Sequence, residues 1–266
     1  MEIDTSVAHV SRVYDYLLGG TDNFAVDRAA AEQVTAAAGG IEKSRAYVRA
    51  NRRFLVRAVR YLVGDVGIRQ FLDIGTGIPN ADNVHGVALE AAPDARIVYV
   101  DNDPIVLAHA HSLLKGGPPG ATAYVDADLH DPDHILELAA ATLDFDQPIA
   151  LMLVSLLHLV RDADDPYGVV ERLVAGIPSG SYLVVTHLTS ESEEMTRLSE
   201  AIEENPTMEY SLIMRSGAEI GRFFTGLELV EPGLVLVDSW RPDGTDPERP
   251  AGVGETPFYG GVARKP

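Results

Sequence analysis

The spacing of apolar residues along the chain changes at about residue 66. Before that point, apolar residues recur at helical spacing and predict three helices, at 10–18, 25–38 and 44–63, of which the first two end at paired glycines. Beyond it, short apolar runs alternate with helical segments, which favours crossover units and a largely parallel sheet. The predicted strands are 70–74, 97–101, 123–126, 149–155 and 182–186.

Three Asp-Pro pairs mark predicted helix starts. Asp103-Pro104, Asp131-Pro132 and Asp165-Pro166 each place a capping acid before a proline at the first helical position. This repeated signal supports the alternation of strands and helices.

The last third of the chain predicts two capped helices followed by two strands. The spacing of Ser190 and Glu193, and again of Ser216 and Glu219, is typical of a capping box. Strands are expected at 234–237 and 258–263, joined by a polar loop at 241–257. We predict one α/β domain over residues 1–266, with a helical cap at 1–65 and a doubly wound, Rossmann-like core at 66–266.

Composition narrows the possible partners. The 266 residues are 46% hydrophobic and include no cysteine, which excludes disulfides, thiolate nucleophiles and cysteine-based zinc sites. A net charge of −19 repels phosphate backbones and anionic lipids, so we expect neither nucleic acid nor membrane as a partner. The first ten residues lack the basic and apolar regions of a secretory signal, and we expect a cytoplasmic protein.

Two predicted strand ends carry the candidate chemistry. The strand at 70–74 runs into Asp73, Gly75 and Gly77, a spacing that lets the backbone approach a ligand closely. The next strand ends at Asp101, 24 residues after Gly77. An acid there can accept hydrogen bonds from both hydroxyls of a ribose, so the expected ligand contains an adenosine-like group.

The glycine pattern favours one cofactor over another. A dinucleotide fingerprint has a third glycine, and the position that would hold it is Asn80. Asp73 would repel a pyrophosphate but would suit an amino group and a sulfonium cation. S-adenosylmethionine therefore fits better than NAD, and a NAD(P)-dependent oxidoreductase is the alternative.

The motif Asp73-Ile74-Gly75-Thr76-Gly77 resembles the first motif of class I S-adenosylmethionine-dependent methyltransferases. Longer stretches resemble one bacterial family of them, long catalogued as a domain of unknown function. The stretches are 12–20, 22–24, 51–55, 68–110, 128–132, 156–158, 223–233 and 259–262. The resemblance implies a mostly parallel seven-stranded sheet that closes with a C-terminal antiparallel hairpin. It implies methyl transfer to an oxygen or nitrogen of an unidentified small molecule.

The resemblance also implies residue roles. Asp73 and the backbone of Gly75, Thr76 and Gly77 would hold the methionine part, and Asp101 the ribose. Asn102 would flank the adenine, and Asp128 and Leu129 would contact it. Asp126 competes with Asp128 because the strand end is uncertain by a few residues.

Further candidates lie after the fourth strand and near the N-terminus. Ser155 should border the cofactor, and His158 is a candidate base, although it could equally be a packed histidine. Tyr14, Tyr16, Asn23 and Phe24 could form a lid and acceptor pocket, or simply an amphipathic helix with a polar turn.

Two features are assigned no site. Six arginines at 45–60 are expected to pair internally with the acidic excess, and the histidine spacings indicate no metal site. A third possible function is a regulatory protein that binds S-adenosylmethionine without turnover.

Overall fold

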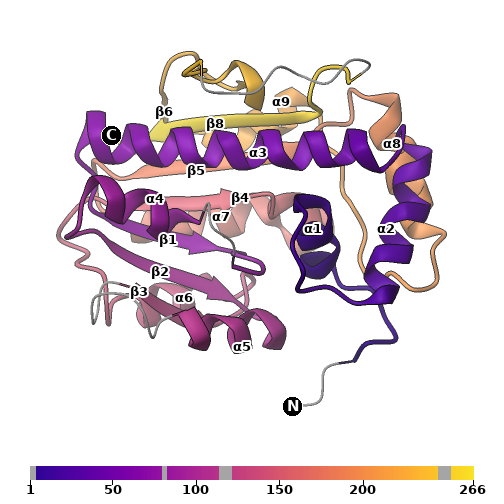
Figure 1. Cartoon of the computed structure of the whole chain (residues 1–266). Helices are drawn as coiled ribbons and strands as arrows, with labels where there is room; N and C mark the ends of the chain where they lie inside the picture. Colours follow the sequence, from indigo (N-terminus) through magenta and orange to yellow (C-terminus); the bar gives the residue numbers. More distant parts are fainter. Residues whose placement is uncertain (1–3, 80–82, 114–121, 245–252) are drawn as a thin grey trace.

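The computed structural model describes residues 4–79, 83–113, 122–244 and 253–266, with the backbone alone at 109–113 (Figure 1). Three helices come first: α1 (Val10–Leu18), α2 (Ala25–Ala37) and α3 (Ile41–Tyr61), which continues into a π-helical turn at Leu62–Val66. Gly19 ends α1 with a φ of 91°, a left-handed conformation that glycine adopts without strain. The predicted N-terminal helices are confirmed.

The sheet has the predicted parallel core and antiparallel end. Five parallel strands are β1 (Gln70–Ile74), β2 (Arg96–Asp101), β3 (Thr122–Asp126), β4 (Ala150–Val154) and β5 (Tyr182–Leu188). β8 (Phe258–Arg264) runs antiparallel to β5, and the order is β3-β2-β1-β4-β5-β8-β6.

The resemblance implied seven strands, and the described sheet has eight, because two short strands share one edge of β8. β6 (Glu228–Leu229) and β7 (Val235–Leu236) both pair with β8, at different heights on the same edge. The predicted hairpin corresponds to β7 and β8, whereas β6, whose two residues are exposed, was not expected.

The connecting helices are α4 (Val84–Ala91), α5 (Pro104–Leu113), α6 (Pro132–Ala139), α7 (Pro166–Gly176), α8 (Glu193–Glu203) and α9 (Gly217–Gly221). Of these, α5, α6 and α7 begin at the three Asp-Pro pairs, as predicted. The Asp131 and Asp165 side chains each accept a backbone hydrogen bond from the first turn of their helix.

One predicted cap is wrong and one is confirmed. Ser216 and Glu219 form a reciprocal capping box at α9. α8 instead begins after Ser192, because the backbone N–H of Ser190 donates to the carbonyl of Arg215 (3.0 Å). Ser190 thus lies in the turn that follows the bridge between Thr189 and Arg215, and Ser192 is the residue that precedes α8.

The core is divided between the two faces of the sheet. Phe71, Ile97 and Met152 face a buried cluster shared with α1 to α4, whereas Leu72, Val98 and Leu151 face one shared with α6, α7 and α9. Figure 1 shows α3 and α4 on one face and α1 at the edge where β1 and β2 end. No helix in the described ranges is long and apolar enough to cross a membrane.

Candidate functional site

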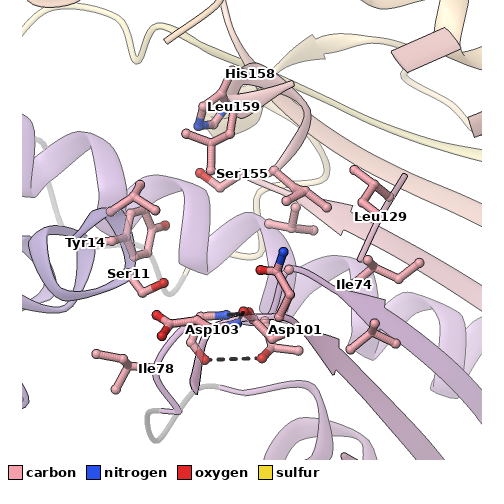
Figure 2. Close-up of a pocket in the computed structure, with 18 of the residues that line it drawn as sticks. Ser11, Tyr14, Ile74, Ile78, Asp101, Asp103, Leu129, Ser155, His158 and Leu159 are labelled. Carbon is pink, nitrogen blue, oxygen red and sulfur yellow. Dashed lines mark hydrogen bonds between the residues drawn. The ribbon is translucent and has the colours of Figure 1, made fainter. Parts of the chain in front are cut away.

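A cavity of about 310 Å³ opens at the carboxyl ends of β1 to β4, beside α1 (Figure 2). The strand order reverses between β1 and β4, where ligands of open α/β sheets gather. We call this cavity the crevice. It brings together most of the predicted site residues: Tyr14, Gly75, Thr76, Gly77, Asp101, Asn102, Asp128, Leu129, Ser155 and His158.

The two glycines after β1 serve different purposes. Gly75 has a φ of 72°, and a Cβ there would lie 2.5 Å from a methyl carbon of Leu156. Gly77 has a φ of 63°, yet nothing lies within 4 Å of where its Cβ would be. The left-handed φ favours glycine at both positions, and a side chain at Gly75 would also displace Leu156, whereas the space beside Gly77 is open toward the crevice.

Asp101 holds the glycine loop and still has free acceptor capacity. Its carboxylate accepts from the backbone N–H of Gly77 (3.0 Å) and of Asp103 (2.9 Å). Burial raises the pKa of Asp101, which these hydrogen bonds oppose. A carboxylate has about four acceptor sites, so roughly half remain for a ligand.

The structure separates Asp128 from its competitor Asp126. Asp128 lines the crevice and accepts from the Asn102 side chain (3.0 Å) and the His130 backbone (2.9 Å). Partial burial pushes its pKa upward, but the hydrogen bonds from His130 and Asn102 outweigh that effect and lower the pKa. Asp126, at the end of β3, is exposed and is not among the residues that line the crevice.

Asp73 lies behind the crevice wall. It is buried within β1 and is not among the lining residues. Burial raises its pKa to about 7, with Arg52 opposing the shift and Asp101 adding to it. Asp73 can therefore act on a ligand through its charge, without being exposed to the crevice.

Tyr14 and Ser155 meet at the far side of the crevice (Figure 2). The Tyr14 hydroxyl accepts from the side chain of buried Asn51 (3.0 Å). Burial raises the pKa of Tyr14, although Arg52 and hydrogen bonds from Asn51 and Ser155 act against this. Ser155 has a φ of 61°, and its N–H donates to the Thr186 hydroxyl (2.9 Å).

The two buried histidines differ in their partners. His187 donates from Nδ1 to the Leu188 carbonyl (2.7 Å) and accepts at Nε2 from Arg215 (2.8 Å), and burial lowers its pKa to about 4. His158 is only 5% exposed, and its Nδ1 has no hydrogen-bond partner in the described structure. Burial, with His187 and Arg215, places the pKa of His158 well below its usual value, so the ring is neutral.

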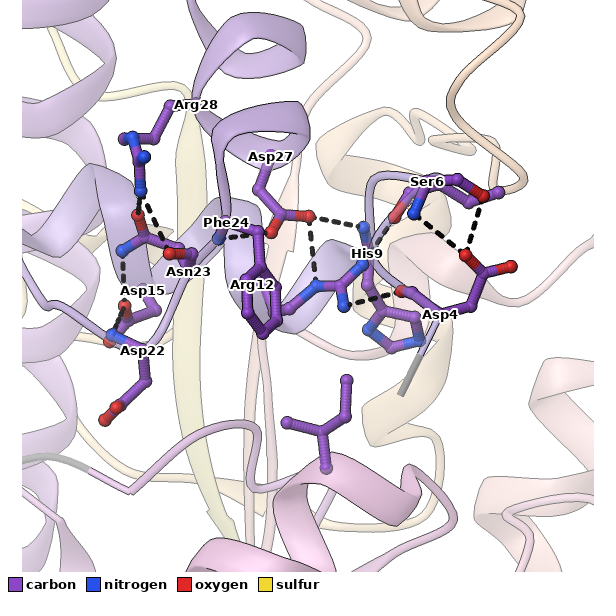
Figure 3. A network of polar contacts seen from close by, with 12 residues as sticks. Asp4, Ser6, His9, Arg12, Asp15, Asp22, Asn23, Phe24, Asp27 and Arg28 are labelled. Carbon is purple, nitrogen blue, oxygen red and sulfur yellow. Dashed lines mark hydrogen bonds and ion pairs between the residues drawn. The ribbon is translucent and has the colours of Figure 1, made fainter. Parts of the chain in front are cut away.

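A buried ion pair that the sequence analysis missed positions α1 (Figure 3). The Asp27 carboxylate accepts from Arg12 Nε (3.0 Å) and from the backbone of His9 (3.0 Å) and Phe24 (2.8 Å). Arg12 also donates to the carbonyls of Asp4 and Val7. One carboxylate thus joins the N-terminal segment, α1 and the start of α2, and a residue pair 15 apart offers no sequence signal for this.

The structure places three of the expected acceptor residues elsewhere. The Tyr16 hydroxyl donates to Glu32 (2.8 Å). Tyr16 is two residues from Tyr14 and therefore lies on another face of α1. Asn23 donates to Asp15 (2.8 Å), and Phe24 packs under the Arg12 guanidinium. None of the three is among the residues that line the crevice, so they do not form the expected acceptor pocket there.

Arg52 is a second residue that the sequence analysis missed. It is the one arginine or lysine among the described residues that line the crevice. Other arginines of α3 follow the predicted internal pairing, such as Arg45 with Glu42 (2.8 Å) and Arg60 with Asp243 (3.6 Å). Its neighbour Asn51, which bonds to Tyr14, shows which part of α3 meets the crevice.

Metal ligands do not cluster in the described part of the chain, where no three of the histidine, aspartate and glutamate side chains are grouped to hold an ion. The side chains of His109 and His111, which lie two apart on α5, are outside the described structure.

Comparisons with known proteins agree with this geometry. Residues 1–266 match the model of a family described as S-adenosyl methyltransferase. A DUF574 family protein from Streptomyces avermitilis is 43% identical, with 100% of both chains covered and a TM-score of 0.90. A candidate methyltransferase from Thermobifida fusca is 40% identical over 98% of this chain and 96% of its own, with a TM-score of 0.87.

A more distant structure shares the fold. An O-methyltransferase family protein from Burkholderia thailandensis is 13% identical, covers 85% of this chain and 58% of its own, and has a TM-score of 0.54. No curated protein matches the chain.

Proposed function

Because this chain belongs to the S-adenosyl methyltransferase family, we propose that its crevice binds S-adenosylmethionine with the adenosine at the tips of β2 and β3. The protein is an S-adenosylmethionine-dependent methyltransferase, and the family match argues against the oxidoreductase alternative. The residues present fit this cofactor, since Asp101 has spare acceptor sites and the space beside Gly77 is open. The crevice volume of about 310 Å³ is at the lower end for small-molecule pockets.

Each part of the cofactor has a proposed partner in this chain. Asp101 would bind the ribose hydroxyls, and Asp128 would accept from the adenine amino group. Asn102 and Leu129 would flank the adenine, and the backbone from Gly75 to Gly77 would follow the methionine part. These roles rest on the positions of the side chains around the crevice.

Arg52 would bind the cofactor carboxylate. A guanidinium can make two parallel hydrogen bonds to a carboxylate. Arg52 lines the crevice next to Asn51, and its charge acts on Tyr14. Asp73, behind the wall, would add negative charge near the sulfonium.

Bound S-adenosylmethionine supplies a methyl group already activated by its positive sulfur. The chain's own contribution is then to align the acceptor and to exclude water, which in general accounts for roughly 7–11 kcal/mol of a barrier. α1 borders the crevice, and Tyr14, Ser155 and His158 form the wall away from the strand tips that are proposed to bind the adenosine. His158 is the proposed base.

The acceptor is proposed to be a small molecule with an oxygen or nitrogen nucleophile. The net charge of −19 argues against nucleic acid. We retain the single domain, with a cap at 1–65 and a core at 66–266, and the cytoplasmic location as predictions.

Asp101 at the tip of β2 carries the proposal, and Asp101→Ala tests it. Losing two charge-assisted hydrogen bonds to the ribose, at about 1.5 kcal/mol each, should raise the dissociation constant for S-adenosylmethionine roughly 100-fold. Isothermal titration calorimetry measures this directly. Asp126→Ala is the matched control, because Asp126 ends the neighbouring strand outside the crevice.

Equal weakening by both substitutions would refute the ribose assignment. Release of S-adenosylhomocysteine with any member of an acceptor panel would show turnover and eliminate the purely regulatory alternative.

A further inference from the structure

A second cavity of about 100 Å³ adjoins the crevice. The two share Val10, Tyr14, Ser155 and His158, so these four residues form a common wall. The rest of the second cavity comes from α1, α2, α3, α8, the segment after α8, the end of β5 and the start of β8. It therefore lies on the side of the crevice opposite the adenosine end.

The lining of the second cavity carries no formal charge. Its described residues are aliphatic, aromatic or hydroxyl-bearing, apart from Met195 and neutral His158. Tyr47 also lines it, and the Tyr47 hydroxyl donates to Glu194 (3.2 Å). An ionised group without a partner is costly to bury, so a carboxylate or an ammonium would bind poorly here.

The volume limits the size of the occupant. An apolar cavity of roughly 150 Å³ holds benzene in another protein. At about 100 Å³, this cavity admits most of one six-membered ring, with the remaining edge extending toward the common wall. The atom that the ring carries at that edge would then meet Tyr14, Ser155 and His158.

The common wall matches a hydroxyl. The Tyr14 oxygen accepts from Asn51, so its own proton is available to donate to an acceptor oxygen. His158 is neutral and has an unpartnered Nδ1, and a neutral imidazole can accept a proton. A hydroxyl on the acceptor could accept a hydrogen bond from Tyr14 and donate one to His158.

We propose that the second cavity binds the methyl acceptor and that this acceptor is a neutral, compact, phenol-like molecule whose hydroxyl lies at the common wall. This inference rests on the proposed function of the crevice. A bond forms between the hydroxyl oxygen and the methyl carbon, and the carbon–sulfur bond breaks with its electron pair passing to sulfur. The hydroxyl proton passes to His158 and then to water. The oxygen becomes strongly acidic as it gains the methyl group, so a weakly basic imidazole suffices.

Binding of three ring compounds of similar size tests the acceptor class. Phenol, benzoate and benzylamine would be titrated by ligand-observed NMR into the full chain saturated with S-adenosylhomocysteine. We expect phenol to bind at least tenfold more tightly than either charged compound. Tighter binding of benzoate or benzylamine would overturn the proposal.

Leu198→Trp tests the location, because Leu198 lines the second cavity but not the crevice. Phenol binding should be lost while the affinity for S-adenosylhomocysteine changes less than twofold. Leu229→Trp is the control, since Leu229 is an exposed leucine on β6. If Leu198→Trp does not fold, Leu212→Ala enlarges the same cavity and should favour 4-ethylphenol over phenol.

The outcomes separate this inference from the proposed function. Unchanged phenol binding in a folded Leu198→Trp, or an unchanged preference in Leu212→Ala, would overturn the acceptor site while leaving the cofactor site intact. Failure of the unmodified protein to bind S-adenosylhomocysteine would overturn both.

Discussion

The adenosine end and the acceptor end of the site are built in different ways. The adenosine end consists of strand tips, with Asp101, Asn102 and Asp103 consecutive in the chain and Asp128 just after β3. The acceptor end combines α1 and α3 with residues after β4, and its second cavity extends to α8. One end is set by local sequence and the other by packing between distant elements.

The two ends also differ in polarity. Asp101, Asp103 and Asp128 line the adenosine end, where directional hydrogen bonds can recognise one fixed cofactor. The second cavity presents no formal charge and selects by shape and neutrality. Polar residues at the strand tips therefore determine which cofactor binds, whereas the packing of the helices determines which acceptor fits.

The largest expected effect falls on the acceptor end, through the buried pair of Arg12 and Asp27, which are 2% and 0% exposed. Arg12→Met leaves the Asp27 carboxylate buried without its partner, so the free energy of unfolding should fall by about 3–5 kcal/mol. Urea denaturation monitored by circular dichroism measures the loss. Adding Asp27→Asn to Arg12→Met removes the unpaired charge, keeps a side-chain oxygen for the N–H groups of His9 and Phe24, and should restore much of the lost stability.

An exposed pair provides the control. Arg172 and Asp133 make a close bidentate contact (2.7 Å) between α7 and α6, and both side chains are 62% exposed. Arg172→Met should leave stability nearly unchanged because solvent screens that pair. Similar losses from Arg12→Met and Arg172→Met would show that α1 does not depend on its buried pair.

The adenosine end could be predicted from sequence because its signals are local. The bounds of β1 were predicted residue for residue. Gly77 and Asp101, both assigned to the cofactor from the sequence, are joined by a hydrogen bond in the structure. The three Asp-Pro helix starts were also correct. Strand tips and caps depend on a few neighbouring residues, which a sequence displays directly.

The acceptor end could not be predicted to the same extent. The sequence gives no reason to prefer Tyr14 over Tyr16, since both are tyrosines of the same predicted helix. Only the orientation of α1 in the structure shows that Tyr14 lines the crevice and that Tyr16 pairs with Glu32. Arg52 could not be distinguished from five other arginines before the face of α3 was known. The burial of Asp73 depends on the strands on either side of it, so its place behind the wall was equally hidden.

A smaller effect, on cofactor affinity, is expected from a substitution of Arg52, which lies where the two ends of the site meet. Arg52→Gln removes the charged partner proposed for the cofactor carboxylate, a loss of about 2 kcal/mol or roughly 30-fold in affinity for S-adenosylhomocysteine. 5′-Methylthioadenosine lacks that carboxylate, so its affinity should not change. Calorimetry with both ligands compares them in one protein.

Arg53→Gln is the matched control for Arg52→Gln. Arg53 is the next residue of α3, lies 3.9 Å from Asp238 and is not among the lining residues. Equal weakening of both ligands by Arg52→Gln would mean that Arg52 shapes the whole crevice instead of binding one end of the cofactor.

The smallest expected effect is on the pH dependence of binding, through Asp73. Its pKa of about 7 means that the group is mostly protonated at pH 6 and mostly ionised above pH 7. A sulfonium favours the carboxylate, so binding should release a proton, and affinity for S-adenosylmethionine should rise with pH across this window. The gain between about pH 6 and pH 7.5 should reach at most about eightfold if only the ionised form binds.

Two comparisons isolate the Asp73 carboxylate in that pH dependence. S-adenosylhomocysteine has a neutral sulfur, so its affinity should change less over the same range. Asp73→Asn cannot ionise and should make the affinity for S-adenosylmethionine nearly independent of pH, at a value below that of the unmodified protein at pH 7.5. Calorimetry in two buffers of different ionisation enthalpy counts the protons released. If Asp73→Asn kept the full pH dependence, another group of the adenosine end would be the one that titrates, and the charge behind the wall would not reach the sulfonium.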